Sequence, residues 1–386
     1  MRIALDGTPF LIEKTGIGHY TANLIAALAE REPELDLVAF TVSLRAAHHL
    51  KAQVEGMPVQ PCGFNLPANL LYYRIWPHLK MLPAERLIGS FDVFHATNYQ
   101  APALREAALV MTIHDLNFVR FPEMQSKGIR RFMRTLPRLA AKASAILVDS
   151  RFTAAEVEDI LHIGPEKVRV VYPGLDPKFR RPAEEEIQSA LDCYRVDPPY
   201  VAYVGNMHPR KNLYTLIEAY GLLRKQGLEH KLAVIGGGGL GALNNREYQK
   251  LTQMVSEAGL EDSVVFTGYV PDKWLPALLS GADALVLPSL YEGFGLPPLE
   301  AMACGVPVLV SRRASLPEVV GEAGMYLEDP LDAAEIAASL GRLLDDRAAR
   351  ERMSEMGYAQ ARLFDWGETA RRTLDIYREV TAAPCA

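Results

Sequence analysis

Two carboxylates separated by a glycine-rich turn are the residues of this chain best suited to chemistry. Glu292 and Glu300 lie eight positions apart, and Gly293 and Gly295 follow the first of them. Because glycine has no Cβ, a ligand can approach this backbone closely, and the amide groups at a helix start favour an anion such as phosphate. Carboxylates beside a phosphate would repel it, so we expect them to accept hydrogen bonds from hydroxyl groups. The segment therefore predicts a sugar-nucleotide site.

A short helix must position these groups. Pro297 and Pro298 suit a first helical turn, where an N–H group would have no partner, and Gly305 suits the helix end. The sequence predicts a helix over residues 297–304. The structural alternative is a helix whose N-terminal glutamate is favoured by the helix dipole, with a second glutamate solvated in the loop.

Apolar segments that read as buried strands alternate with helical segments throughout the chain, which predicts an α/β fold with parallel sheets covered by helices. A first series of strands is expected at 2–5, 35–42, 92–96, 107–113, 144–149 and 167–172, and a second at 200–204, 231–235, 263–267, 283–287 and 306–310. A segment rich in proline, glycine and charge separates them near 175–198. We expect two Rossmann-like domains facing across a cleft, since 386 residues exceed one usual core.

Several motifs resemble those of one enzyme family. The run E-G-F-G-L-P-P-L-E-A-M-A-C-G-V-P-V from Glu292 resembles the signature of the retaining family 4 glycosyltransferases, which have the GT-B fold. Shorter motifs occur in the order of that family and span most of the chain: Gly16-Ile17-Gly18-His19-Tyr20, His114-Asp115, the run G-N-M-H-P-R-K-N from Gly205 to Asn212, and Leu316-Pro317-Glu318.

The resemblance implies a division of labour along the chain. It implies an acceptor-side domain over residues 1–175 and a nucleotide-sugar domain over residues 176–365. The final segment, 366–386, would return as a helix to the first domain. Donor-binding roles also follow from the resemblance: Glu292 for hydroxyls of the transferred sugar, the backbone of Phe294, Gly295 and Leu296 for the donor, Glu300 for the ribose diol, Val270 for the base, and His114 for the region near the donor sugar.

A departing diphosphate requires positive charge. Enzymes of the other common glycosyltransferase fold hold a metal through an Asp-x-Asp triplet, and this sequence contains none. Arg210 and Lys211 precede a helix predicted over residues 212–226, so two cations and a helix N-terminus can converge on the pyrophosphate. We expect no metal and no cofactor. The alternative is an ordinary basic loop cap.

Two further motifs leave alternatives open. The backbone amides around Gly16 and Gly18 can lie against a phosphate or a sugar, although any turn with positive φ could use these glycines. The family precedent for His114 is retention without a covalent nucleophile, with the departing phosphate helping to deprotonate the acceptor. With Asp115 beside it, His114 could instead be the base of an inverting reaction, or a strand-end histidine satisfied by a carbonyl.

A glycine run suggests an enzyme of another class. Residues 236–241 satisfy G-x-G-x-x-G, and Glu261 and Asp262 follow at about the spacing of a ribose ligand. An NAD-dependent oxidoreductase would carry this fingerprint on the first strand of its domain, whereas here it follows the second. We expect a structural turn.

The acceptor side carries a basic and an aromatic segment. Six cations share one helical face over 127–142, with a kink expected at Pro137: Lys127, Arg130, Arg131, Arg134, Arg138 and Lys142. Upstream, residues 64–83 interleave aromatic side chains with Arg74 and Lys80. Such surfaces suit an anionic membrane or a lipid-linked acceptor, and the alternative is a solvated helix face with a buried loop.

Bulk properties exclude several classes of protein. The net charge of −6 disfavours nucleic acid as a partner. No signal peptide and no run of about 20 apolar residues is visible, which predicts a cytoplasmic protein, at most attached to the inner face of the membrane.

The donor and acceptor are predicted from the resemblance. The segment T-I-H-D-L-N-F from Thr112 resembles that of mannosyltransferases of polysaccharide and lipopolysaccharide assembly, so GDP-mannose is the favoured donor and a glycan or lipid-linked hydroxyl the acceptor. UDP- or ADP-sugars, and a sugar-nucleotide-binding subunit without turnover, are the alternatives.

Overall fold

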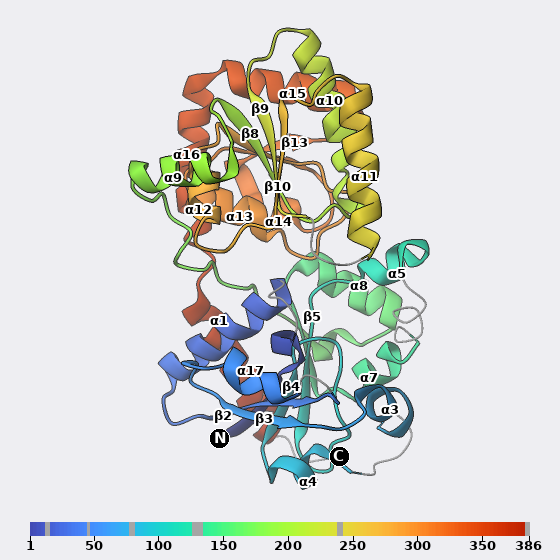
Figure 1. Cartoon of the computed structure of the whole chain (residues 1–386). Helices are drawn as coiled ribbons and strands as arrows, with labels where there is room; N and C mark the ends of the chain where they lie inside the picture. Colours follow the sequence, from blue (N-terminus) through green and yellow to red (C-terminus); the bar gives the residue numbers. More distant parts are fainter. Residues whose placement is uncertain (12–15, 45–46, 77–81, 126–133, 238–241, 383–386) are drawn as a thin grey trace. The chain divides into compact units, whose positions relative to one another are not determined.

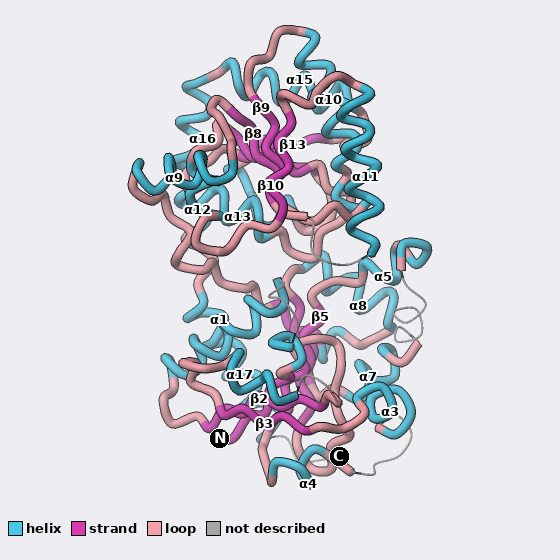
Figure 2. Tube along the Cα trace, in the orientation of Figure 1, coloured by secondary structure: helices cyan, strands magenta, loops and turns pink. Residues whose placement is uncertain are grey.

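The computed structural model describes residues 1–11, 16–44, 47–76, 82–125, 134–237 and 242–382. The chain divides into two compact units, which we call the first unit (Met1–Gly174 with Asp365–Ala386) and the second unit (Leu175–Phe364). Each unit is a parallel sheet covered by helices (Figures 1 and 2).

In its described residues the first unit contains a seven-stranded sheet of order β3-β2-β1-β4-β5-β6-β7. Its strands are β1 (Arg2–Asp6), β2 (Asp36–Val42), β3 (Gln60–Phe64), β4 (Val93–Ala96), β5 (Ala108–Ile113), β6 (Ala145–Val148) and β7 (Val168–Val170). Its helices are α1 (Gly16–Arg31), α2 (Leu50–Gln53), α3 (Ala68–Leu70), α4 (Ala84–Ile88), α5 (Asn117–Arg120), α7 (Leu136–Lys142), α8 (Arg151–Leu161) and α17 (Trp366–Ala382).

Alternate side chains of β1 enter different cores, as the two-residue period of a strand requires. Ile3 and Leu5 pack with α1 and α17 on one face of the sheet, and Ala4 packs on the other face with α7 and α8. The C-terminal helix α17 therefore belongs to the first unit, where Figure 1 shows it in red beside α1 in blue. The predicted return of the last helix is confirmed.

The described part of the second unit contains a six-stranded sheet of order β10-β9-β8-β11-β12-β13. Its strands are β8 (Tyr200–Val204), β9 (Lys231–Ile235), β10 (Val264–Gly268), β11 (Ala284–Leu287), β12 (Val308–Ser311) and β13 (Met325–Leu327). Its helices are α9 (Glu184–Tyr194), α10 (Leu213–Lys225), α11 (Ala242–Glu257), α12 (Leu275–Ser280), α13 (Leu296–Ala303), α14 (Leu316–Val320), α15 (Ala333–Asp345) and α16 (Arg347–Ala361).

In both sheets the strand order reverses once, between β1 and β4 and between β8 and β11. Parallel strands with such a reversal leave a crevice at their carboxyl ends, and ligands of open α/β sheets bind there. The predicted fold class is confirmed.

Candidate active site

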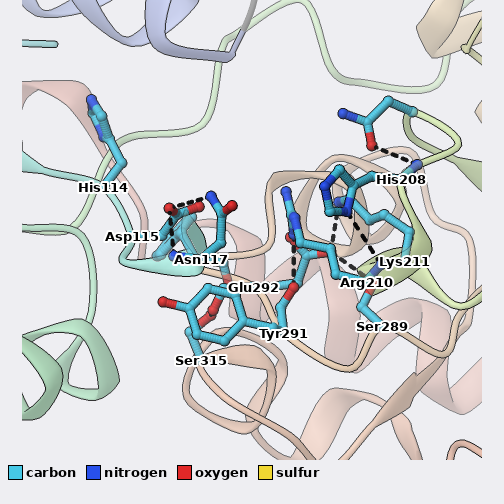
Figure 3. Close-up of polar contacts among 12 residues, drawn as sticks. His114, Asp115, Asn117, His208, Arg210, Lys211, Ser289, Tyr291, Glu292 and Ser315 are labelled. Atoms are coloured by element: carbon cyan, nitrogen blue, oxygen red, sulfur yellow. Dashed lines mark hydrogen bonds and ion pairs between the residues drawn. The ribbon is translucent and has the colours of Figure 1, made fainter. Parts of the chain in front are cut away.

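Both cations predicted to stabilise a leaving group share one carboxylate in the second unit (Figure 3). Arg210 and Lys211 lie in the turn after β8, and Glu292 lies in the loop after β11. Arg210 Nη1 is 3.0 Å from Glu292 Oε2, and Lys211 Nζ is 2.6 Å from Glu292 Oε1. β8 and β11 are paired neighbours where the strand order reverses. The structure thus brings three of the predicted catalytic residues together at the position where ligands bind such sheets.

Glu292 is buried and nevertheless strongly acidic. Burial alone would raise the pKa of its carboxyl group, but the Lys211 ammonium and the Arg210 guanidinium lower this pKa to about 2. Glu292 is therefore ionised at neutral pH. Two cations and one anion leave the cluster with one net positive charge, which favours binding of a phosphate group.

Two serines hold the loop that carries Glu292. Ser289 Oγ donates a hydrogen bond to Glu292 Oε1 at 2.7 Å. Ser315 Oγ lies 2.9 Å and 2.6 Å from the carbonyl oxygens of Glu292 and Phe294, to which it donates. No sequence pattern marks these serines, because the partner of a loop serine is defined only after the chain has folded.

The glycine turn leads directly into α13. This helix spans Leu296–Ala303, one residue earlier at each end than predicted. Gly295 has a φ of 115°, in the left-handed region, and a Cβ there would lie 2.8 Å from Leu316 Cδ2. Glycine is therefore required on two grounds, backbone conformation and space. Gly293 is buried in the same turn.

Glu300 lies half-buried on α13 among other charged groups. Burial raises the pKa of Glu300 to about 7, with Lys178 lowering it and Asp176 and Asp272 raising it further. Lys178 Nζ is 3.0 Å from Asp176 Oδ2 and 3.1 Å from Asp272 Oδ2. Lys178 and Asp272 also line a cavity of about 530 Å³. Glu300 thus gains or loses its proton near neutral pH, under the influence of two residues that line this cavity.

Val270 and the glycine run follow neighbouring strands. Val270 is buried two residues after β10. Gly236 and Gly237, after β9, have φ angles of 95° and 75°. A Cβ on Gly236 would lie 2.9 Å from the Gly205 carbonyl oxygen, so these glycines serve close packing of the strand ends. Residues 238–241 lie outside the described residues. A dinucleotide fingerprint is expected after the first strand of its unit, whereas this glycine run follows β9, the second strand.

The site residues predicted in the first unit lie at β5 and α1. His114 follows β5, with Nδ1 2.7 Å from Asp149 Oδ2 and Nε2 3.0 Å from the Thr97 carbonyl oxygen. Gly16, which is exposed, is the first residue of α1, and Gly18 is buried in its first turn. Asp149 was not among the predicted site residues.

The prediction of one basic helix over residues 127–142 was partly wrong. Helix α7 spans Leu136–Lys142, and Pro137 lies in its first turn, not at a kink. Proline suits this position because a first-turn residue needs no N–H group. Three of the six cations lie outside the described residues: Lys127, Arg130 and Arg131.

The aromatic segment upstream is largely buried. Leu71, Tyr72 and Trp76 belong to the core of the first unit, and Trp76 Nε1 donates a hydrogen bond to the Leu82 carbonyl oxygen at 3.0 Å. These three side chains are therefore buried, as in the structural alternative, although residues 68–75 form short helical turns and not a loop. Lys80 lies outside the described residues.

Across the described ranges, no helix has both the length and the apolar character needed to cross a bilayer. Within the same ranges, no three histidine, cysteine, aspartate or glutamate side chains form a group that could hold a metal ion.

Comparison with known proteins identifies the family. The family model described as Glycosyltransferase Family 4 matches residues 14–179, and the one described as Glycosyl transferases group 1 matches residues 194–360. The chain is 31% identical over 394 residues to O-antigen chain mannosyltransferase B of Escherichia coli, covering 98% of this chain and all of that one. It is 30% identical to the MMP alpha-(1->4)-mannosyltransferase of Mycolicibacterium hassiacum, covering 77% and 73%.

Among solved structures, Anabaena Alr3699/HepE in complex with UDP-glucose matches with a TM-score of 0.75 and 19% identity, covering 98% of this chain and 99% of that one. Such identity shows the fold alone. Together with the two parallel sheets and the returning α17, the family matches lead to one conclusion: this chain is a glycosyltransferase enzyme of family 4, with the GT-B fold.

Proposed function

We propose that this enzyme is a retaining, metal-independent mannosyltransferase that moves mannose from GDP-mannose to a hydroxyl group of a glycan or lipid-linked acceptor. The observation that carries the proposal is the cluster of Arg210, Lys211 and Glu292 at the reversal between β8 and β11. The full-length similarity to an O-antigen chain mannosyltransferase supports mannose as the transferred sugar.

In this proposal the cluster stabilises the leaving group. The bond between the sugar C1 and the diphosphate oxygen breaks, and the net positive charge of the cluster compensates the charge that develops on the diphosphate. The acceptor oxygen bonds to C1 on the face that the diphosphate leaves, and the acceptor proton passes to a departing phosphate oxygen. Glu292 orients sugar hydroxyls and Glu300 accepts hydrogen bonds from the ribose diol.

The remaining donor contacts are proposed from the family motifs. The backbone around Gly293, Phe294, Gly295 and Leu296 would meet the diphosphate and sugar, and that of Gly16 and Gly18 would meet the donor from the acceptor-side domain. Gly293 and Gly295 are buried in a tight turn, which supports a close approach of this backbone to a ligand.

Asp272 supports guanine as the base. It lies two residues after Val270, and it lines the same cavity as Lys178, whose Nζ is 3.1 Å from Asp272 Oδ2. The N1–H and N2–H groups of guanine offer two donors to one carboxylate, whereas uracil offers a single N–H there. We expect Asp272→Asn to reduce the affinity for GDP about tenfold, a loss of about 1.4 kcal/mol, and to change that for UDP little.

A thermal-shift panel of GDP, UDP, ADP and their sugars tests the donor. A ligand at about 100 times its dissociation constant adds roughly 2.7 kcal/mol of apparent stability, and we expect GDP and GDP-mannose to give the largest shifts. NMR of the product should show an α-mannoside, formed equally in EDTA. A larger shift with UDP-glucose, a β-linked product, or activity that EDTA removes and manganese restores would each overturn the corresponding part of the proposal.

We further propose that the enzyme acts in the cytoplasm at the inner face of the membrane. Exposed Arg138 and Lys142 on α7 are the described cations that support contact with anionic lipid. Co-sedimentation with anionic vesicles should exceed that with neutral vesicles at low salt and fall at high salt. Equal, negligible binding to both would exclude this contact.

A further inference from the structure

Both ring nitrogens of His114 face atoms that only accept hydrogen bonds. Nδ1 lies 2.7 Å from the Asp149 carboxylate, and Nε2 lies 3.0 Å from the Thr97 carbonyl oxygen. A neutral imidazole carries one N–H group and can donate to only one of them. Only the imidazolium, with a hydrogen on each nitrogen, satisfies both contacts.

The register of the sheet dictates this pairing. β5 and β6 are parallel neighbours in which Ile113 lies opposite Val148. His114 and Asp149 are the residues that directly follow β5 and β6, so the two side chains leave the sheet at the same level. Asp149 is buried, and among the described residues its Oδ1 has no hydrogen-bond partner. Its negative charge is therefore compensated mainly by His114.

The other groups around His114 carry no positive charge that would disfavour its protonation. Tyr20 of α1 and Tyr99, after β4, lie in T-shaped arrangements with the ring. Burial and the nearby carboxylates raise the pKa of both phenols, so both are neutral. His95 on β4 is neutral because burial, aided by the charge of His114, lowers its pKa to about 3. Asp115, the next residue, adds negative charge. Burial opposes a charged imidazole, but these carboxylates and the two hydrogen bonds raise the pKa of His114 above its usual value.

We propose that Asp149 is a positioning residue of the transfer site, which holds His114 as a fixed imidazolium and thereby excludes it as a proton acceptor. A general base needs a lone pair that can reach the acceptor hydroxyl, and here both ring nitrogens carry hydrogens directed at Asp149 and Thr97. The ion pair of His114 and Asp149 is neutral as a whole, so His114 then serves as a fixed hydrogen-bond donor, and the proton of the acceptor leaves by another route. This role rests on the proposed function only in assigning His114 to the transfer site.

¹⁵N NMR of histidine-labelled enzyme tests the protonation state directly, with His114 assigned from the spectrum of His114→Gln. At pH 7.5 we expect both ring nitrogens of His114 to be protonated. In Asp149→Asn the amide oxygen still accepts from Nδ1 but carries no charge, so the titration midpoint of His114 should fall by roughly one pH unit or more. Asp159→Asn, an exposed residue of α8, is the matched control and should leave the midpoint unchanged.

Activity measurements separate positioning from a merely structural role. In Asp149→Asn we expect kcat at pH 7.5 to fall about tenfold and to recover at lower pH, where the imidazole is protonated again, while donor KM changes little. An unprotonated ring nitrogen in the wild-type enzyme at pH 7.5, or an unchanged midpoint in Asp149→Asn, would overturn the inference. The NMR result needs no donor, so an error in the proposed donor or product would leave it standing.

Discussion

Glu292 pairs with two cations, and in the proposed function it also orients hydroxyls of the sugar. Its side chain is buried against Arg210 and Lys211, and each of its oxygens contacts one of them. Removal of one partner from such a group leaves uncompensated buried charge, which costs far more than the loss of an exposed pair. Stability and turnover should therefore both depend on this carboxylate.

We expect Glu292→Gln to lower the free energy of unfolding by about 3 kcal/mol and turnover by roughly a hundredfold, because the cations lose their fixed positions. Urea denaturation and steady-state kinetics measure the two effects. Glu328→Gln, which removes an exposed partner of Arg312, is the matched control and should change stability by less than about 0.5 kcal/mol. Equal losses in the two variants would contradict the buried cluster.

The same carboxylate predicts a dependence of stability on acid. The pKa of Glu292 in the folded state, about 2, lies below its usual value of 4.5. Its contribution to stability is therefore complete above pH 4.5 and is lost as the pH falls toward 2. In Glu292→Gln this part of the acid dependence should be absent.

Glu300 predicts pH-dependent nucleotide binding near neutrality. Its pKa is raised to about 7, so its ionised form, which we propose accepts hydrogen bonds from both ribose hydroxyls, increases between pH 6 and pH 8. Calorimetric titration should show affinity for GDP rising over this range, and Glu300→Gln should be weaker and flat. Glu355→Gln, an exposed residue of α16, should retain the rise. Ionisation of a carboxyl with a raised pKa disfavours the folded state, so this residue also makes stability decline from pH 4.5 to 7.

Helix α13 contains Glu300 and begins four residues after Glu292. The start of this helix depends on the backbone conformation of Gly295. Gly295 has a left-handed φ, with Leu316 close to where a Cβ would lie. Gly227, after α10, also has a positive φ, of 95°, but has no atom within 4 Å of a Cβ. The two glycines therefore differ in space but share the demand on the backbone.

We expect Gly295→Ala to lower the free energy of unfolding by about 2 kcal/mol or more and Gly227→Ala by about 1 kcal/mol. Thermal and urea unfolding measure the difference, which isolates the clash with Leu316. Donor KM should rise in Gly295→Ala alone, because the turn proposed to contact the donor phosphate is displaced. A similar stability of the two variants would show that Leu316 moves aside without cost.

Considered as a whole molecule, the chain places most of the residues proposed to bind the donor in one continuous segment, with Gly16 and Gly18 as the exceptions. Arg210, Lys211, Val270, Glu292 and Glu300 all belong to the second unit, Leu175–Phe364, whereas the first unit needs both ends of the chain. α17 supplies Ala370, Leu374 and Tyr377 to the core of the first unit. Loss of the C-terminal segment should therefore disrupt the first unit alone.

We expect residues 175–364, produced alone, to fold and to bind GDP within about tenfold of the full chain, a difference of about 1.4 kcal/mol, without transferring sugar. Circular dichroism and calorimetry test this. A chain ending at residue 364 should expose apolar core of the first unit and aggregate. Failure of the isolated segment to bind GDP would mean that the first unit contributes much of the nucleotide site.

Local patterns account for most of the elements. Pro297, Pro298 and Gly305 located α13 to within one residue because they restrict the backbone where they stand. The long apolar strands were predicted for the same reason, since burial on both faces requires continuous apolar residues. Strands β3 and β13 escaped prediction, because each is a short strand at a sheet edge, with side chains that remain partly exposed.

Contacts between residues far apart in the sequence could not be predicted, because they depend on the order of the strands in the sheet and no local sequence pattern specifies that order. The sequence placed Arg210, Lys211 and Glu292 each after a strand, but only the pairing of β8 with β11 makes them one cluster with a single net charge. In the same way His114 was visible as a strand-end histidine, whereas its partner Asp149 became evident from the register of β5 with β6. Chemistry-bearing residues and their elements are local properties of a chain, while protonation states and ion pairs arise when folding brings charges into contact away from water.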